Sequence, residues 1–300
     1  MNNYTLKWVY LIVLSIIWGS SFILIKKGLV GLTDFQLGSL RIVLTSIFLF
    51  SVGFRSLMQI GKKDWIWVVI SGFTGTFFPS FLFAIAQNHI DSGVTSILNS
   101  TVPLNTLIVG ALLFGIGVAK RQVWGVFIGL LGTILLILAG IWMHNNGTVE
   151  SSGITRNHWY GGLILIATIG YAFNVNIIKK YLSNVSALAI TTGNFLCIIV
   201  PAFVILYYTG FFDTIMQDRQ MQISFGYVAI LSLFGTAMAK VIFNKLVHIA
   251  SPVFASSVTY TMPLVAVMWG VVDGERFSWL QLIAAVIILF GVYLSNKRVN

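Results

Sequence analysis

The chain has 300 residues and a net charge of +10, and hydrophobic residues make up 57% of it against 9% for charged residues. Soluble domains are about a quarter charged, so this composition excludes an ordinary soluble fold and predicts a protein whose solvent is mostly lipid. The basic residues stand in ones and twos between apolar segments and form no basic stripe. We therefore interpret the charge as a topology signal and expect the lipid bilayer, and no nucleic acid, as a partner.

Ten apolar segments are long enough to cross a membrane, whose apolar core of about 30 Å needs roughly 20 apolar residues in a helix. Five segments fall in each half of the chain. They are residues 8–25, 34–53, 65–86, 94–114, 123–142, 160–178, 187–208, 223–243, 253–272 and 279–295. The sequence therefore predicts an all-α membrane protein with ten transmembrane helices.

The first predicted helix is echoed by the sixth. At a constant offset of 153 residues, Trp18 pairs with Tyr171 and Ser21 pairs with Asn174. Within each helix the aromatic residue and the polar residue are three positions apart, so they lie on one helical face. These residues offer stacking faces and hydrogen-bonding groups near mid-membrane, although aromatic residues in a span also serve as packing or interface anchors.

Later segments repeat at an offset of 160 residues, which pairs Pro103 with Pro263. We predict a first five-helix repeat over residues 1–143, a connecting loop over 144–157 and a second repeat over 158–300. An odd number of spans in each repeat makes the second copy enter the membrane from the opposite side. Two inverted five-helix repeats result, an arrangement common among secondary transporters.

The basic residues also predict the orientation of the chain. With the N-terminus in the cytoplasm, eleven Lys and Arg residues lie on the inner side and five on the outer side. This bias follows the positive-inside rule, so both termini are predicted to be cytoplasmic. Lys26 and Lys27 lie on the outer side against the rule, and snorkelling at a helix end accounts for them.

Two cations fall inside predicted spans, Arg41 in the second and Lys240 in the eighth. Each costs about 2.5–3.5 kcal/mol at a helix centre on insertion scales, so each needs a cavity or a partner. One interpretation is that they bind an anionic group, such as a carboxylate, in a cavity. The alternatives are a structural pairing of Arg41 with carbonyls or Asp34, and snorkelling of Lys240 to the interface.

Pro103 and Pro263 are predicted to kink equivalent helices, because each removes a backbone hydrogen bond and frees the carbonyl of Asn99 or Thr259. Irregular helices at mid-membrane are tolerated where they line a cavity. A purely structural kink is the alternative. Asn99 is polar and Tyr260 adjoins the second kink, so both become candidate binding residues.

The chain has no motif of an enzyme or of an ATP-driven pump. Its four histidines lack metal-ligand spacing, and it contains no P-loop, G-x-S-x-G or dinucleotide fingerprint. We predict no catalytic residue, no metal and no cofactor. No carboxylate lies deep in a predicted span, which weakens the case for direct proton coupling.

Several motifs together resemble the EamA family of the drug/metabolite transporter superfamily. They are the run Trp18-Gly19-Ser20-Ser21-Phe22, the position of Arg41, the prolines Pro103 and Pro263, and Gly274-Glu275-Arg276 before the last helix. The resemblance covers nearly the whole chain and implies an inner-membrane exporter of metabolites, amino acids among them, that works by alternating access. One departure is Gly115, which stands where the second repeat has Glu275.

The resemblance also implies which helices surround the cavity. These are the first, third, fourth, sixth, eighth and ninth, while the fifth and tenth lie outside. The candidates Trp18, Ser21, Asn99, Tyr171, Asn174, Lys240 and Tyr260 all fall on lining helices. Arg41 is on the second helix, which makes it a weaker candidate.

We therefore predict a secondary transporter that exports a small amphipathic substrate, foremost an amino acid, as a monomer or homodimer. Its predicted substrate-binding residues are Trp18, Ser21, Asn99, Tyr171, Asn174, Lys240 and Tyr260. Drugs, nucleosides and sugar phosphates stay open as substrates, and a lone Lys240 without a second cavity cation argues against phosphate. A membrane receptor or scaffold without transport is the alternative from another class.

Overall fold

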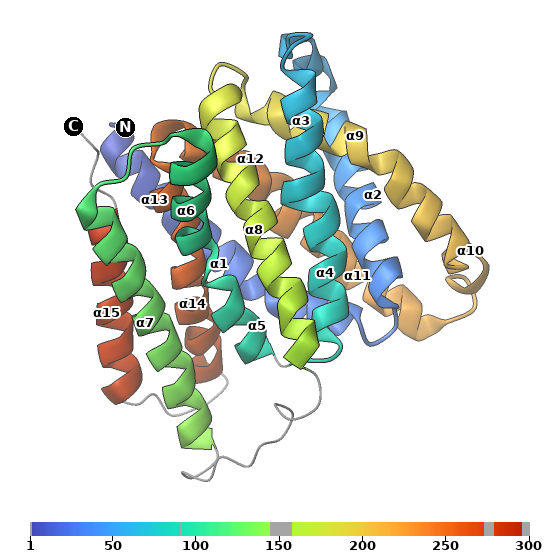
Figure 1. Ribbon diagram of the computed structural model, residues 1–300. Coiled ribbons are helices and arrows are strands. Elements are labelled where there is room, and N and C mark those ends of the chain that lie inside the picture. The colour runs from blue at the N-terminus through green and yellow to red at the C-terminus, as the bar shows by residue number, and fades with distance from the viewer. Residues whose placement is uncertain (1, 91, 145–157, 273–278, 296–300) are drawn as a thin grey trace.

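The computed structural model describes residues 2–90, 92–144, 158–272 and 279–295, and every regular element in these ranges is helical (Figure 1). Helices satisfy their own backbone hydrogen bonds, as an apolar solvent requires. Six helical stretches are long and apolar enough to cross a membrane: Asn3–Gly28, Asp34–Gln59, Trp65–Gln87, Trp159–Tyr181, Ala187–Tyr208 and Arg219–Ile249. Helices also lie in the other four predicted segments, but the count of ten spans stays a prediction.

The first half of the chain forms α1 to α7. The elements are α1 Asn3–Gly28, α2 Asp34–Gly53, the 3₁₀ helix η1 Phe54–Gln59, α3 Trp65–Gly72, the π-helix η2 Phe73–Phe77, α4 Phe78–Gln87, α5 Ser92–Asn99, α6 Val102–Phe114 and α7 Lys120–His144. Thr33 begins α2 with a capping box, in which Thr33 and Gln36 each accept a backbone hydrogen bond from the other. α6 ends at Gly115, whose φ of 63° suits glycine.

The second half forms α8 to α15. The elements are α8 His158–Tyr181, α9 Ala187–Tyr208, α10 Phe211–Thr214, α11 Arg219–Ile230, the π-helix η3 Leu231–Met238, α12 Ala239–Ile249, α13 Pro252–Ser256, α14 Val258–Val272 and α15 Trp279–Ser295. Ser186 and Asp218 cap the first turns of α9 and α11 through their side-chain oxygens. These caps fix where the two helices begin.

The π-helices η2 and η3 occupy equivalent places, between α3 and α4 and between α11 and α12. Each contains a Gly-Thr pair, Gly75-Thr76 in η2 and Gly235-Thr236 in η3. A π-helical turn alters the usual backbone pairing and is frequent at functional sites. The carbonyl oxygens of Gly75 and Gly235 accept hydrogen bonds from side chains on other helices.

The backbone near the two prolines, where the sequence predicts kinks, differs between the two halves. The helix is interrupted at Ser100 and Thr101, and Pro103 lies in the first turn of α6 directly afterwards. Pro263 instead lies inside α14, which continues through it, and the interruption comes earlier, at Ser257. Hydroxyl groups in this stretch donate to carbonyls three residues back, and such bonds let a helix tolerate a proline in an apolar solvent.

The helices of the two halves pack in a reciprocal pattern. The equivalent helices α7 and α15 pack together at one edge of the bundle, and α2 packs on α9 at the other (Figure 1). α1 packs on α11, α12 and α14 of the second half, while α8 packs on α3, α4 and α6 of the first. Exchanging the two halves leaves this set of contacts unchanged.

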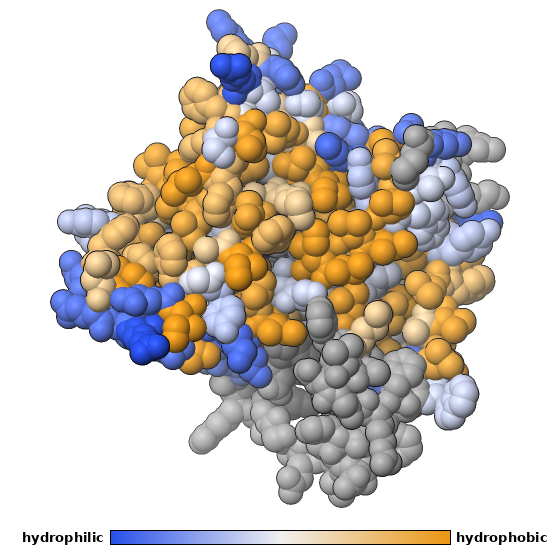
Figure 2. Space-filling view, turned by 180° about the vertical axis from the view of Figure 1, so that it is seen from behind, coloured by the Kyte–Doolittle hydropathy of each residue, from blue (hydrophilic) through white to orange (hydrophobic). Residues whose placement is uncertain are grey.

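The helices pack closely, and the exterior of the bundle is apolar, as expected of a protein surrounded by lipid. A Cβ atom at Gly291 of α15 would lie 2.7 Å from the Cα atom of Gly129 in α7, so only glycine permits this approach. Figure 2 shows a broad hydrophobic surface over the middle of the molecule. On α9 alone, Val200, Phe203 and Tyr208 are 66%, 47% and 83% exposed, which water would disfavour and lipid tails accept.

Candidate functional site

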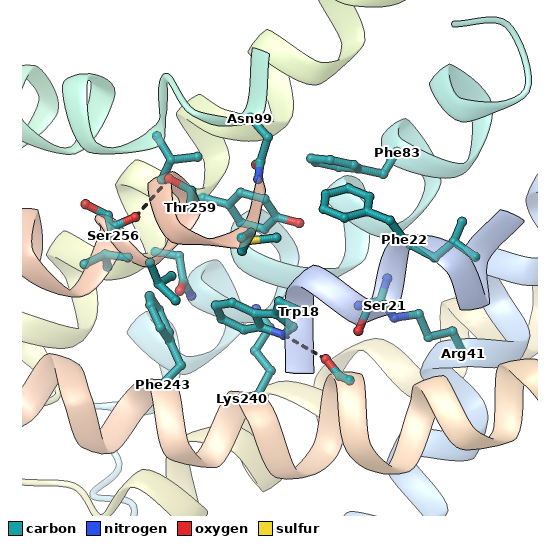
Figure 3. A pocket seen from close by; sticks show the side chains of 18 residues that line it. Trp18, Ser21, Phe22, Arg41, Phe83, Asn99, Lys240, Phe243, Ser256 and Thr259 are labelled. Carbon is teal, nitrogen blue, oxygen red and sulfur yellow. Dashed lines mark hydrogen bonds between the residues drawn. The ribbon is translucent and has the colours of Figure 1, made fainter. Parts of the chain in front are cut away.

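A cavity of about 120 Å³ lies inside the bundle and takes its walls from both halves (Figure 3). Aromatic, polar and cationic side chains line it: Trp18, Phe22, Phe83, Tyr171 and Phe243; Ser21, Asn99, Asn174, Ser256 and Thr259; Arg41 and Lys240. Its volume is close to the roughly 150 Å³ of an apolar cavity that admits benzene. The cavity therefore suits a small molecule with both apolar and polar parts.

The two aromatic residues predicted from the repeat both line this cavity. The indole Nε1 of Trp18 donates a 2.9 Å hydrogen bond to the Gly235 carbonyl, and its ring centroid lies 5.3 Å from that of Phe243. The ring of Tyr171 lies 6.0 Å from that of Phe83. Trp18 is thus held by its polar edge, and both residues present aromatic surface to the cavity.

Lys240 reaches the cavity from α12. Its Nζ atom donates a hydrogen bond to the Gly75 carbonyl in η2 and lies 5.8 Å from the ring centroid of Tyr171. The side chain therefore points inward and does not snorkel to the membrane interface.

Arg41 also lines the cavity, although the family resemblance excludes the second helix from the lining. The resemblance made Arg41 a weaker candidate, and the structure places it in the lining. The Nε atom of Arg41 donates a 2.7 Å hydrogen bond to the Thr236 hydroxyl in η3. The described lining contains no Asp or Glu, and the described ranges hold no cluster of three His, Cys, Asp or Glu residues that could bind a metal.

The predicted amide and hydroxyl residues line the cavity with different freedom to bind. The Nδ2 atom of Asn174 donates to the carbonyl and hydroxyl of Ser71, at 3.0 and 2.7 Å. The Ser21 hydroxyl donates to the Ile17 carbonyl at 2.7 Å. Asn99 is 5% exposed, and its Oδ1 atom has no hydrogen-bond partner among the described residues. Asn99 therefore keeps an amide oxygen that can accept a hydrogen bond from a ligand.

Tyr260, predicted as a substrate-binding residue, does not line this cavity. The side chain is fully buried, its ring packs on Gly129, and its hydroxyl donates to the Val126 carbonyl of α7 at 2.8 Å. Its place next to the kink predicted at Thr259 did not specify the face of α14 on which Tyr260 lies. Its neighbours Thr259 and Met262 face the cavity instead.

The repeat contained a signal for further lining residues. Phe83 and Phe243 form a pair at the offset of 160 residues, and both line the cavity. Phe22 and Met262 complete the apolar wall, and no motif distinguished them. Matched positions in a repeat are therefore a better guide to this cavity than adjacency to a proline.

A second, larger cavity of about 730 Å³ lies at the end of the bundle that carries the N-terminus. Lys179 in its wall donates to three carbonyls at the end of α12, and Lys180 donates to the Phe114 carbonyl at the end of α6. Both lysines thus cap helix ends. In the wall of this cavity, Asn176 Nδ2 of α8 also donates to the Thr106 carbonyl of α6 at 3.0 Å.

The two cavities follow one another along the same helices. On α6, Val102 lines the smaller, inner cavity and Thr106 lines the larger one. On α13, Ser256 lines the inner cavity and Val253 lines the larger one. Residues lining different cavities are therefore about one helical turn apart. Only a thin layer of side chains separates the two spaces.

Comparison with known proteins gives a family match and full-length relatives. A model described as the EamA-like transporter family matches residues 6–138 and again residues 158–297. The uncharacterized inner membrane transporter YedA of Escherichia coli K12 is 26% identical over 291 residues, covering 95% of this chain and 88% of that protein. The uncharacterized transporter YetK of Bacillus subtilis is 24% identical over 286 residues, covering 92% and 82%.

A plant protein and a solved structure extend this likeness. The chloroplastic WAT1-related protein At3g02690 of Arabidopsis thaliana is 24% identical over 301 residues, covering 97% of this chain and 69% of that protein. A crystal structure of another protein matches with a TM-score of 0.72 at 15% identity, covering 95% of this chain and 94% of that one. At this identity the structural likeness shows a shared fold alone.

Replacing two tyrosines separates packing from binding. Tyr260→Phe removes an interhelical hydrogen bond and should therefore lower the free energy of unfolding by about 0.6–2 kcal/mol. It should leave the Michaelis constant of transport unchanged. Tyr171→Leu, a change on the cavity wall that removes the aromatic ring, should raise that constant with little loss of stability. Thermal unfolding in detergent and flux into liposomes measure the two effects. An altered Michaelis constant in Tyr260→Phe would return that residue to the binding site.

Proposed function

The chain belongs to the EamA-like transporter family, and we propose that it is an inner-membrane secondary transporter that exports small metabolites, with amino acids and their derivatives as the favoured class. The observation that carries this proposal is the cavity inside the bundle, where aromatic surface, a free amide oxygen and two cations converge. An amphipathic molecule with a carboxylate matches that lining. Relatives named as inner membrane transporters support the location.

We propose ten spans in two inverted repeats with both termini in the cytoplasm. Three observations support this architecture: the family model matches the chain twice, the π-helices recur at equivalent places, and the helix contacts are unchanged when the halves are exchanged. The bias of basic residues supports the orientation. The second cavity would then open towards the cytoplasm.

Each part of the substrate has a proposed partner in the cavity. Trp18 and Tyr171 bound its apolar part, Asn99 accepts a hydrogen bond from it, and Lys240 attracts its carboxylate. Ser21 and Asn174 shape the wall, since their donors are already engaged. An apolar wall with a few convergent polar groups is the usual composition of a small-molecule site.

Transport would proceed by rocking of one half against the other. The thin layer between the two cavities supports this mechanism, because a small displacement of α6 and α8 would join them. The interruptions before α6 and α14 and the two π-helices give the bundle irregular segments at this level. The cavity would thus face each side of the membrane in turn.

Cavity size and charge bear on the alternative substrates, drugs and phosphates. The small volume disfavours bulky drugs. The argument against phosphate, which relied on a lone cation, no longer holds once Arg41 joins Lys240. A receptor or scaffold without transport would bind ligand and give no flux in liposomes.

Removing the charge of Lys240 tests the proposed site. Lys240→Ala and Lys240→Gln should both lower flux of carboxylate-bearing substrates in liposomes about ten- to a hundredfold, since a hydrogen bond to a charged group contributes about 1.5–3 kcal/mol. Lys240→Gln keeps a donor for the Gly75 carbonyl, and size-exclusion chromatography checks the amount of folded protein. Flux at the wild-type level in both variants would remove Lys240 from the site.

Cross-linking the two halves tests the rocking mechanism. His89 at the end of α4 and Tyr160 of α8 stack with ring centroids 3.8 Å apart and belong to different halves. In a Cys197→Ser background, joining His89→Cys to Tyr160→Cys with a short reducible linker should stop flux, and reduction should restore it. Asp34→Cys with Asn88→Cys joins two hydrogen-bonded positions of the same half and should leave flux intact. Undiminished flux in the fully linked His89–Tyr160 variant contradicts rocking of the halves.

A further inference from the structure

The charged side chains that line the inner cavity among the described residues are all positive. Arg41 enters from α2 and Lys240 from α12, and the described lining offers no carboxylate to balance them. We propose that the cavity selects substrates of net negative charge over neutral zwitterions and cations. This selectivity rests on the proposed transport function. It narrows the favoured class, amino acids and their derivatives, to those members that carry a net negative charge.

Arg41 is fixed in place and keeps most of its donors. Its Nε atom is bound to the Thr236 hydroxyl, and the Ser232 hydroxyl donates to its backbone carbonyl. Among the described residues, its two terminal nitrogens have no hydrogen-bond partner. A guanidinium carries five N–H donors in a planar fork and stays charged in proteins, so the free end matches a carboxylate or phosphate through two parallel bonds.

Lys240 supplies the second charge. One of its three N–H donors is bound to the Gly75 carbonyl, and its Nζ atom lies over the Tyr171 ring. The aromatic face nearest to Lys240 is therefore already occupied by a cation. An ammonium group of a zwitterionic substrate could not use that face without approaching Lys240.

The two cations are not required by the repeated architecture. At the offset of 153 residues Arg41 corresponds to Asn194, and at the offset of 160 residues Lys240 corresponds to Ser80. Both counterparts are buried and neutral, and Ser80 donates to a backbone carbonyl of its own helix. The same scaffold therefore tolerates uncharged residues at these places, which points to ligand binding as the reason for the charges.

A bound anion would offset the free-energy cost of holding the two cations inside the bundle. Charges in an apolar interior are stable when they are paired and hydrogen-bonded. A substrate with one or two negative groups and no ammonium supplies the missing partner, whereas a neutral zwitterion adds a positive group beside two others. Acidic metabolites and N-acylated or 2-oxo relatives of amino acids share this chemistry.

The test compares solutes that share one apolar body and differ in net charge. Purified protein in liposomes is first given a panel of metabolites to find the apolar body that it transports fastest. Flux is then measured for that body as the amino acid, the N-acetyl amino acid and the amino acid amide, which are zwitterion, anion and cation. We expect the N-acetyl anion to be transported at least tenfold more efficiently than the zwitterion, and the amide not at all.

Variants assign the selectivity to the two cations. Arg41→Gln and Lys240→Gln should each bring the ratio of anion to zwitterion close to one, whereas Arg41→Lys, which keeps the charge and loses the fork, should keep the preference with weaker anion binding. Thermal unfolding of the same preparations without solute shows whether a silent variant is folded, and stabilisation by the N-acetyl solute then reports its binding. The assays are run with and without added chloride at constant ionic strength, and chloride should inhibit anion flux.

The outcomes separate the two proposals. Equal transport of zwitterion and anion, or zwitterion transport that requires chloride, overturns the charge selectivity and leaves the transporter proposal standing. A selectivity ratio that stays unchanged in both glutamine variants also overturns it. If no solute of the panel moves in wild-type protein, the transport function itself fails.

Discussion

The hydrogen bonds that anchor two half-buried cations to the paired π-helices are the interactions on which the cavity depends. Lys240 of the second half donates to Gly75 in η2 of the first, and Arg41 of the first half donates to Thr236 in η3 of the second. Trp18 adds a third bond across the halves, to Gly235. Because an unpartnered cation is costly in an apolar bundle, these bonds fix where both charges lie and leave their other donors facing the cavity.

This arrangement links binding to movement in the proposed mechanism. A ligand shifts a conformational equilibrium only by interacting differently with the two states. Here the bonds that hold the cations also join the two halves, so an anion that takes over part of their hydrogen bonding changes the free energy of that junction. The same contacts would serve recognition and coupling, with no separate hinge required.

The sequence predicted the helical segments and most of the cavity because both depend on local patterns. Apolar length specified where helices lie, and the offset of 153 residues selected Trp18, Ser21, Tyr171 and Asn174. All four line the cavity, as do Asn99 and Lys240. Repeated positions carry this information because equivalent helices present equivalent faces.

The remaining residues depend on helix rotation, which a linear pattern specifies poorly. Tyr260 was chosen because it adjoins the predicted kink, but on α14 its side chain lies against α7. Arg41 was discounted by helix number, but its long side chain reaches from α2 to η3. The π-helices change the register of the residues that follow them, and no sequence signal marked them.

The central claim is that two equivalent halves lie inverted across the membrane around this cavity. Lys63 and Met216 occupy equivalent loops, 153 residues apart, and both are exposed. In a Cys197→Ser background, a membrane-impermeant thiol reagent added to intact cells should label Met216→Cys, and should label Lys63→Cys only after permeabilisation. Labelling of both positions from the same side would contradict the inverted arrangement and the transport pathway built on it.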